Sequence, residues 1–91
     1  GKVIFFGEMR GILPLPEGEK VTLSEAILRM GGGGGFANLK KIKLTRKDPE
    51  TGRPTTRVVD VDAVIHKNDS TADVELQDGD RIEVPAKLIN L

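Results

Sequence analysis

Few side chains in this sequence could take part in catalysis or bind a metal ion. His66 is the only histidine and cysteine is absent, so a transition-metal site would need carboxylates beside one imidazole. Neither Ser24 nor Ser70 has a histidine and a carboxylate placed in an evident way, as a nucleophilic site requires. We therefore expect no nucleophilic catalysis, no metal site and no cofactor. His66 is expected to face solvent or to cap a helix.

Carboxylates are frequent toward the end of the chain and raise the question of a calcium site. They are Asp60, Asp62, Asp69, Asp73, Asp78 and Asp80. The twelve-residue pattern of a calcium-binding loop is absent, however. The Asp78-Gly79-Asp80 stretch is explained adequately as a tight turn, so no calcium site is predicted.

Five consecutive glycines stand in "ILRMGGGGGFANLK" (Ile27–Lys40). A phosphate-binding loop needs a strand before the glycines, a helix after them and a Lys-Ser/Thr pair at the end, and none of these is found here. A dinucleotide-binding fingerprint fails as well, because no strand leads into the run. We interpret the run as the end of a helix followed by a loop. The alternative is a loop that closes over a ligand or a neighbouring subunit, formed by Gly33, Gly34, Gly35 and Phe36, with Phe36 as its anchor.

Basic residues cluster after this loop, at Lys40, Lys41, Lys43, Arg46 and Lys47. One interpretation is a solvated strand face whose charges are paired by Asp60 and Asp62. The other is a surface for an acidic ligand or partner, centred on Arg46, Arg53 and Arg57.

Composition excludes several classes of partner. The chain has 91 residues, 14 basic and 14 acidic, so it lacks the positive excess that attracts nucleic-acid phosphates. Three phenylalanines are the only aromatic residues, which leaves few rings for stacking on bases. No apolar run is long enough for a membrane span, so we expect no membrane insertion by this chain. Residues 1–91 are expected to form a single domain, and the start at Gly1 without Met suggests a piece excised from a longer protein.

The elements that must position these residues can be predicted in order. "KVIFFG" (Lys2–Gly7) is typical of a buried strand, and Ile12–Leu15 of a short edge strand that contains Pro14. "TLSE" (Thr22–Glu25) matches a capping box and predicts a helix from about Leu23 to Met30, ended by Gly31.

The second half of the chain predicts a hairpin, a crossover and a last strand. "KKIKLTRK" (Lys40–Lys47) alternates, "DPETGRP" is turn chemistry, and "TTRVVDVD" (Thr55–Asp62) returns as a strand. We expect a register that pairs Lys43 with Asp60, which also sets Lys41 opposite Asp62, Ile42 opposite Val61, Leu44 opposite Val59 and Arg46 beside Arg57. A short helical or irregular crossover over residues 63–76 then leads to a strand before Pro85, with Ile82 and Val84 facing inward.

This order of elements predicts an α+β fold of the β-grasp type, with one main helix packed on a mixed sheet of four or five strands. The stretches "VIFFGEMRG", "LPLPEGEKVTLSEAILRMGG", "LKKIKLTRK", "VVDVDAVI" and "VELQDGDRIEVP" resemble the soluble-ligand-binding β-grasp (SLBB) domain of bacterial polysaccharide export proteins. The resemblance runs from Val3 to Pro85 and is most specific at Leu23–Ile27 with Gly31-Gly32 and around Gly79-Asp80. The chain departs from the family pattern at Arg10-Gly11, at Met30 and in the length of its glycine run.

The resemblance implies a non-catalytic periplasmic domain of an envelope or outer-membrane-associated protein that exports capsular or exopolysaccharide. Its implied partners are other protomers of the export assembly and an acidic polysaccharide. We expect the outer strand faces and the Gly31–Phe36 loop to contact protomers or glycan, and Arg46, Arg53 and Arg57 to contact an acidic sugar. Two other classes of function stay open. One is a receptor for a small ligand such as cobalamin, with an apolar pocket beside the helix, and the other is an accessory domain of a redox enzyme complex.

Overall fold

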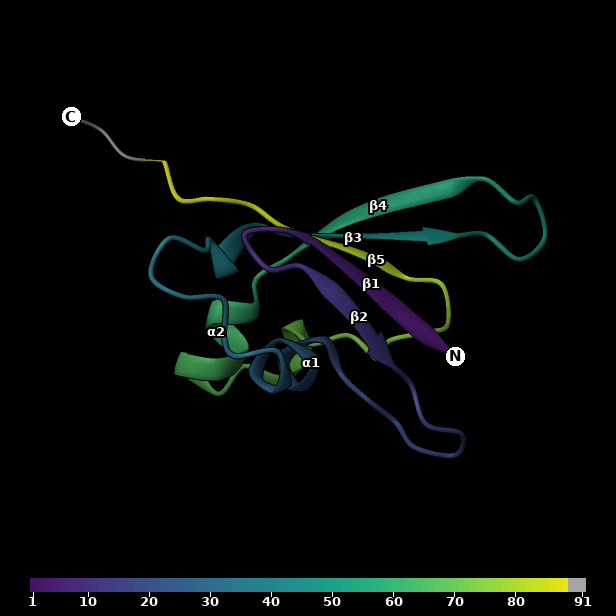
Figure 1. Ribbon diagram of the computed structural model, residues 1–91, viewed down its shortest axis with the longest axis horizontal. Coiled ribbons are helices and arrows are strands. Elements are labelled where there is room, and N and C mark those ends of the chain that lie inside the picture. The colour runs from purple at the N-terminus through teal and green to yellow at the C-terminus, as the bar shows by residue number, and fades with distance from the viewer. Residues whose placement is uncertain (89–91) are drawn as a thin grey trace.

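The computed structural model describes residues 1–88, in which five strands form one mixed sheet (Figure 1). The strands are β1 (Lys2–Gly7), β2 (Gly11–Pro14), β3 (Ile42–Lys47), β4 (Pro54–Val59) and β5 (Arg81–Val84). Their spatial order is β2-β1-β5-β3-β4, with β1 and β5 parallel and the other neighbouring pairs antiparallel. The predicted α+β, β-grasp-like architecture is confirmed, and β2 with Pro14 lies at one edge as expected.

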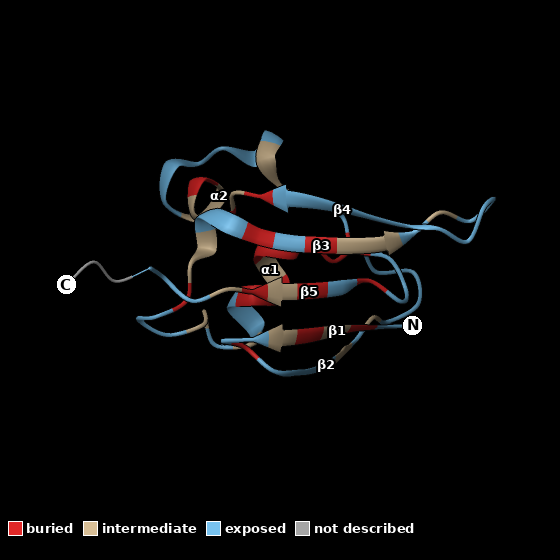
Figure 2. Ribbon diagram, turned by 90° about the horizontal axis from the view of Figure 1, so that it is seen from above, coloured by how far each residue is buried: buried red, intermediate tan, exposed pale blue. Residues whose placement is uncertain are grey.

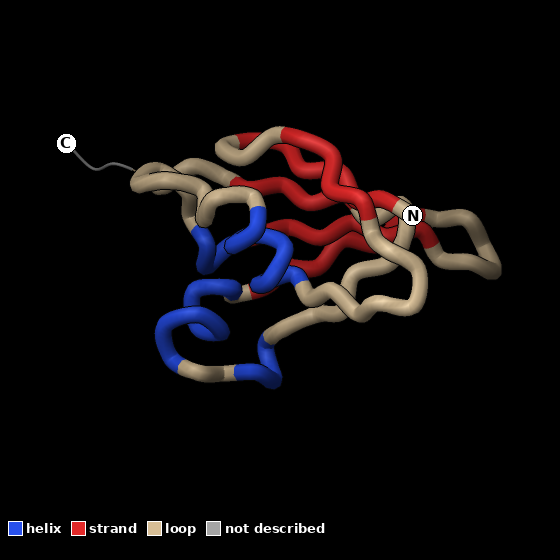
Figure 3. Tube along the Cα trace, turned by 60° about the horizontal axis from the view of Figure 1, so that its bottom comes forward, coloured by secondary structure: helices blue, strands red, loops and turns tan. Residues whose placement is uncertain are grey.

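Two α-helices pack on one face of this sheet, α1 (Leu23–Arg29) and α2 (Val61–Lys67). Single 3-10 turns, η1 (Leu39–Lys41) and η2 (Ser70–Ala72), lie beside them. Figure 3 shows the helical segments together on the lower side of the sheet, with the other sheet face uncovered. The sequence predicts one main helix and a short helical or irregular crossover over residues 63–76. That crossover is partly helical, and its helix α2 begins earlier, at Val61, and has the same length as α1, seven residues.

Alternation along the strands places the core between the sheet and the helices. The buried side chains of the three central strands are Val3, Phe5, Ile42, Leu44, Ile82 and Val84. Leu23, Ala26 and Ile27 of α1 cover them from the helix side. Figure 2 shows the buried residues concentrated in β1, β5 and β3, whereas β4 is exposed along most of its length. The core is almost wholly aliphatic, as the composition requires.

The ends of α1 follow from local sequence. The Thr22 hydroxyl accepts a hydrogen bond from the Glu25 N–H at 3.4 Å, as the capping box predicts. At the other end the Gly31 N–H donates to the Leu28 carbonyl and the Gly32 N–H donates to the Ile27 carbonyl, at 3.1 and 2.9 Å. With Gly31 at a φ of 101°, this is the paired hydrogen-bond pattern of a Schellman motif, and the helix stops where the sequence predicts.

The predicted register of the β3–β4 hairpin is wrong by two residues. Lys43 lies opposite Val58 instead of Asp60, and Leu44 lies opposite Arg57. The strand ends at Val59 because the Asp60 carboxylate accepts a hydrogen bond from the Ala63 N–H at 2.9 Å and so begins α2.

Several expected pairs are lost with this register. Asp62 belongs to α2 and Lys41 to η1, so the expected pair of Lys41 with Asp62 does not form. Arg46 lies opposite Thr55, so it is not the cross-strand partner of Arg57. Lys43 instead lies 3.6 Å from the Glu83 carboxylate of β5.

A helix able to cross a lipid bilayer is not found among residues 1–88, because none combines the required length and apolar character.

Candidate functional site

An open groove of about 760 Å³ lies between the glycine loop and α2. Its lining comes from the glycine loop and η1, from α2 and from the segment after β5: Gly32, Gly34, Ala37, Asn38, Leu39, Lys40, Asp62, His66, Lys87 and Leu88. The volume falls within the range of roughly 300–1,000 Å³ that small-molecule sites occupy. The groove is therefore the candidate binding site of the described part of the chain.

The glycine loop takes a shape that side chains would resist. Gly31 to Gly34 all have positive φ, between 71° and 101°. At Gly33 a Cβ atom would stand 2.9 Å from the Ala37 Cβ and 3.3 Å from the terminal methyl of Met9. The loop can fold back against the core at this point only because Gly33 has no side chain, and this fold exposes Gly34 to the groove.

Backbone hydrogen bonds attach the far end of this loop to the segment that follows β5. The Asn38 N–H donates to the Pro85 carbonyl and the Lys87 N–H donates to the Phe36 carbonyl, both at 2.7 Å. This bridge places Lys87 on the groove wall. The Phe36 ring itself is 66% exposed, so the backbone of Phe36 anchors the loop and its ring does not.

The polar groups of the groove come from three separate elements. On α2, His66 Nδ1 lies 2.9 Å from a carboxylate oxygen of Asp62, one helical turn earlier. Since a carboxylate accepts, Nδ1 carries the proton and the orientation of the imidazole is fixed. Within residues 1–88, Lys40 of η1 and Lys87 take part in no ion pair. The lining thus contains one carboxylate that is hydrogen-bonded to a histidine and two lysines that make no ion pair within residues 1–88.

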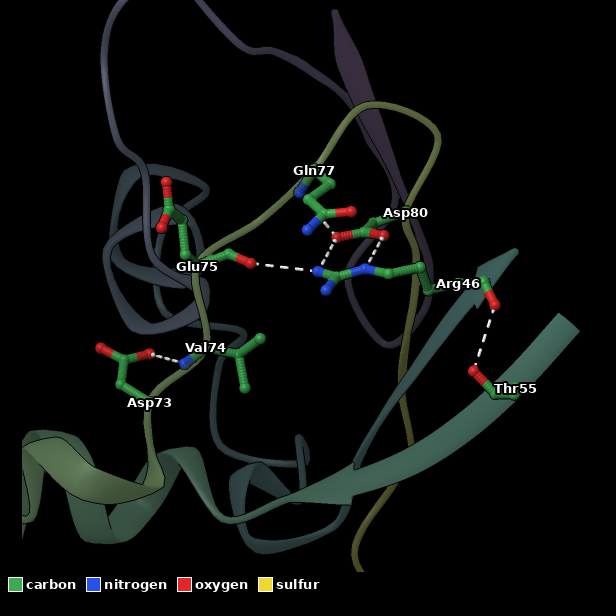
Figure 4. Close-up of polar contacts among 7 residues, drawn as sticks. All are labelled: Arg46, Thr55, Asp73, Val74, Glu75, Gln77 and Asp80. Atoms are coloured by element: carbon green, nitrogen blue, oxygen red, sulfur yellow. Dashed lines mark hydrogen bonds and ion pairs between the residues drawn. The ribbon is translucent and has the colours of Figure 1, made fainter. Parts of the chain in front are cut away.

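A second polar cluster lies under β3, around Arg46 and Asp80 (Figure 4). Asp80 is fully buried, and its carboxylate accepts hydrogen bonds from Arg46 Nε at 2.8 Å, from Arg46 Nη2 at 2.7 Å and from the Gln77 N–H at 2.8 Å. Arg46 Nη2 also donates to the Glu75 carbonyl at 3.0 Å. The hydrogen bond to Asp80 raises the pKa of Arg46 above its ordinary value.

This cluster has a structural role in the fold. It fastens the turn before β5 to the end of β3, and its bidentate geometry compensates the buried charge of Asp80. The Asp78-Gly79-Asp80 turn expected from sequence is present, with Gly79 at a φ of 86°, but the burial of Asp80 was not foreseen.

The residues predicted to bind a ligand fall into two groups that the structure keeps apart. Gly33, Gly34, Gly35 and Phe36 form the loop beside the groove, at the left of Figure 1, whereas the β3–β4 turn that contains Arg53 projects at the right. The molecule is 45 Å long in this direction. Arg53 and Arg57 are exposed, and Arg46 is engaged with Asp80. The loop and the hairpin arginines therefore do not form one site.

Sequence reasoning missed four residues of the groove: Lys40 as a member of a site, Asp62, His66 and Lys87. The i, i+4 spacing of Asp62 and His66 was a usable signal, because these positions face the same side of a helix. It was overlooked because the strand was expected to continue through Asp62. The expectation that His66 faces solvent is confirmed, since its side chain is 63% exposed. No group of three or more His, Cys, Asp or Glu side chains placed to hold a metal occurs in residues 1–88.

Comparison with known families agrees with this architecture. The family model described as the SLBB domain matches residues 2–84, which include all five strands and both helices. The search of curated proteins gives no match. SLBB domains are binding domains rather than catalytic ones and are typically periplasmic. With the groove and the β-grasp-like sheet in place, the match over almost the whole described chain shows that this protein belongs to the SLBB domain family.

Proposed function

We propose that this chain is a non-catalytic periplasmic domain of a bacterial capsular or exopolysaccharide export protein, where it binds glycan and contacts neighbouring protomers. The observation that carries the proposal is the groove at the glycine loop, in a chain of a binding-domain family. A groove open to solvent and lined by both polar and apolar groups suits a segment of a long polymer, because such a ligand must enter and leave from the side.

Glycan contact is proposed at the glycine loop and at the hairpin arginines. Phe36 offers an exposed ring beside the groove, to which the apolar face of a sugar can pack. Arg53 in the β3–β4 turn and Arg57 of β4, which lies opposite Leu44, are exposed and offer a second cationic surface, for an acidic residue further along the same polymer. Arg46 supports the β3–β4 hairpin from within, through Asp80.

Contact with neighbouring protomers is proposed on the uncovered sheet face and at the edge strand β4. Ile12 of β2 and Val58 of β4 are 60% and 57% exposed. Within the described residues β4 has a partner strand on one side only. An open edge of β-branched residues is a template for a strand of a second copy. The net formal charge of zero means that copies of the domain do not repel each other over long range.

Two measurements on the 91-residue chain test the proposal. Calorimetric titration with trigalacturonate, maltotriose and cobalamin compares an acidic sugar, a neutral sugar and a small-ligand alternative. Sedimentation velocity over a range of protein concentrations tests contact between copies. We expect saturable binding of trigalacturonate and reversible self-association. Absence of binding to both sugars, together with a monomer at every concentration, would contradict the proposal.

Cobalamin is included in the titration because the groove is large enough for a compact ligand. Sequence reasoning placed such a pocket beside the main helix, whereas the groove lies against α2 and carries charged residues on its wall. Tight binding of cobalamin without binding of either sugar would replace the export function by the receptor function.

A further inference from the structure

We propose that the groove binds the carboxylate of an acidic saccharide, with Lys40 and Lys87 as the charged contacts and His66 as an oriented hydrogen-bonding group. The inference rests on the proposed function and deepens it. It names the class of sugar and places its acidic group at the glycine-loop end of the molecule, away from the hairpin arginines.

The charge balance of the groove favours an anion. Lys40 and Lys87 approach it from different segments and have no acidic partner within residues 1–88. The one carboxylate on the wall, Asp62, is already hydrogen-bonded to His66. A carboxylate entering between the two ammonium groups would gain charge-assisted hydrogen bonds from each of them.

Backbone groups of the glycine loop are further donors next to the groove. In residues 1–88 the amides of Gly33, Gly34 and Gly35 have no hydrogen-bond acceptor, whereas those of Gly31 and Gly32 donate to α1. Gly34 lines the groove, and a Cβ atom built on it would have no atom within 4 Å, so the backbone is open to solvent at this point. Uncapped amides of a glycine-rich turn next to cationic side chains form a concave surface suited to anions.

The rest of the lining favours a sugar over a flat apolar ligand. The described groove wall contains no Phe, Tyr or Trp, and its apolar groups, Ala37, Leu39 and Leu88, alternate with the polar residues. The Asn38 side-chain oxygen accepts from the Lys40 N–H at 3.2 Å, which leaves its amide nitrogen for a hydroxyl. Alternating small apolar and hydrogen-bonding groups match the faces and edges of a pyranose ring.

Charge reversal with a matched control tests the inference. The variants are Lys40→Glu, Lys87→Glu and, as control, Lys41→Glu, which changes an exposed lysine of the same η1 turn that does not line the groove. Calorimetry measures the affinity of each for trigalacturonate, with maltotriose and citrate as the neutral-sugar and free-carboxylate arms. Thermal unfolding verifies that each variant is folded.

We expect the affinity for trigalacturonate to fall about tenfold or more in Lys40→Glu and in Lys87→Glu, because each change removes a charge-assisted contact. The control should stay within about twofold of the unmodified chain. Citrate and maltotriose should bind more weakly than trigalacturonate.

Four outcomes would overturn the inference. Unchanged affinity in both groove variants would place the sugar elsewhere and leave the proposed function standing. An equal loss of affinity in the Lys41→Glu control would show that the effect comes from the net charge of the protein and not from the groove. Citrate binding as tightly as trigalacturonate would show that the site recognises a carboxylate and not a saccharide. If the unmodified chain binds no saccharide, the proposed function fails together with the inference.

Discussion

At the scale of single residues, the arginine expected to bind a ligand is instead part of the fold. Arg46 was selected from sequence as a ligand contact, and in the structure its guanidinium is held by a buried carboxylate and a backbone carbonyl. Its side chain is 29% exposed, whereas that of Asp80 is not exposed at all. If a change at Arg46 weakens ligand binding, the first explanation is therefore a less stable fold and not a lost contact with the ligand.

Replacement of this arginine should destabilise the protein. In Arg46→Leu the Asp80 carboxylate would remain buried with one backbone donor left, from Gln77. We expect the free energy of unfolding to fall by about 3 kcal/mol, the lower end of the range for breaking a buried ion pair. Urea denaturation measures the change.

The matched control is Arg53→Leu, at an exposed position whose side chain makes no ion pair within residues 1–88. It should change the unfolding free energy by less than about 0.5 kcal/mol. Equal losses in the two variants would mean that the Arg46–Asp80 pair does not stabilise the fold.

Of the single-residue features, those set by short-range sequence could be predicted and those set by distant partners could not. The Thr22 cap and Gly31 lie within a few residues of the groups they satisfy, so their roles are visible in the sequence. Asp80 lies 34 residues from Arg46, and nothing local separates it from an ordinary turn aspartate. The groove residues Lys40, His66 and Lys87 likewise meet only through the fold.

At the scale of elements, the glycine run has two different functions along its length. Its first residues end α1, and its later residues shape a wall of the groove. Substitutions at Gly31 and Gly35 can distinguish the two functions. A Cβ atom added at either residue would have no atom within 4 Å, but only Gly31 has a positive φ, which strains a residue with a side chain.

Alanine at these two glycines should therefore have opposite effects. Gly31→Ala should lower the free energy of unfolding by about 1–2 kcal/mol through the strained backbone. Gly35→Ala should leave it unchanged or raise it by up to about 1 kcal/mol, because alanine restricts the unfolded chain. Thermal or urea unfolding of the two variants gives the comparison, and a larger loss at Gly35 would contradict the assignment of the helix end.

The start of α1 depends on a segment far along the chain. The Asp73 carboxylate accepts from the Ser24 N–H at 3.1 Å and from the Ser24 hydroxyl, and the Leu23 N–H donates to the Val74 carbonyl at 2.7 Å. Asp73 thus joins the crossover to the first turn of the helix and satisfies donors that the Thr22 cap does not reach.

Removal of this carboxylate should expose its contribution. We expect Asp73→Ala to cost about 2 kcal/mol, since Ser24 is buried and would lose its acceptor. Asp69→Ala is the control, because the only side-chain hydrogen bond of Asp69 within residues 1–88 is the one it accepts from the Thr71 hydroxyl. Circular dichroism during urea unfolding follows both, and no difference between them would remove Asp73 from the helix cap.

The elements of the first half of the chain were more predictable than those of the second half. Local sequence signals mark the ends of β1, β2 and α1: Gly7, Pro14 and the capping box. In "VVDVDAVI" the alternating pattern suits a strand, but Asp60 caps α2 and stops the strand at Val59. The competition between a strand pattern and a helix cap is decided by packing, because Val61 and Ala63 are buried as part of α2.

At the scale of the whole molecule, the domain is an elongated body with different surfaces at its two ends. The groove and the glycine loop lie at one end and the β3–β4 turn at the other (Figure 1). The formal net charge is zero, so attraction for an acidic polymer must come from local clusters rather than from the field of the whole protein.

Salt should therefore weaken binding of the acidic sugar. The screening length falls from roughly 10 Å at 0.1 M salt to about 3 Å at 1 M, which attenuates exposed lysine–carboxylate contacts. We expect the affinity for trigalacturonate to drop several-fold between low salt and 0.5 M sodium chloride, with maltotriose binding unchanged. Calorimetry in the two buffers decides, and an affinity for trigalacturonate that is independent of salt would argue against an ionic site.

The central claim is that the groove of this SLBB domain binds an acidic saccharide. The most direct test is an amide NMR titration of the 91-residue chain with trigalacturonate, with maltotriose and cobalamin titrated in parallel. The account predicts saturable shifts at the amides of Gly33 to Phe36, and around Lys40, His66 and Lys87. Shifts confined to Arg53 and Arg57 of the β3–β4 hairpin, or no shifts with any sugar, would contradict it.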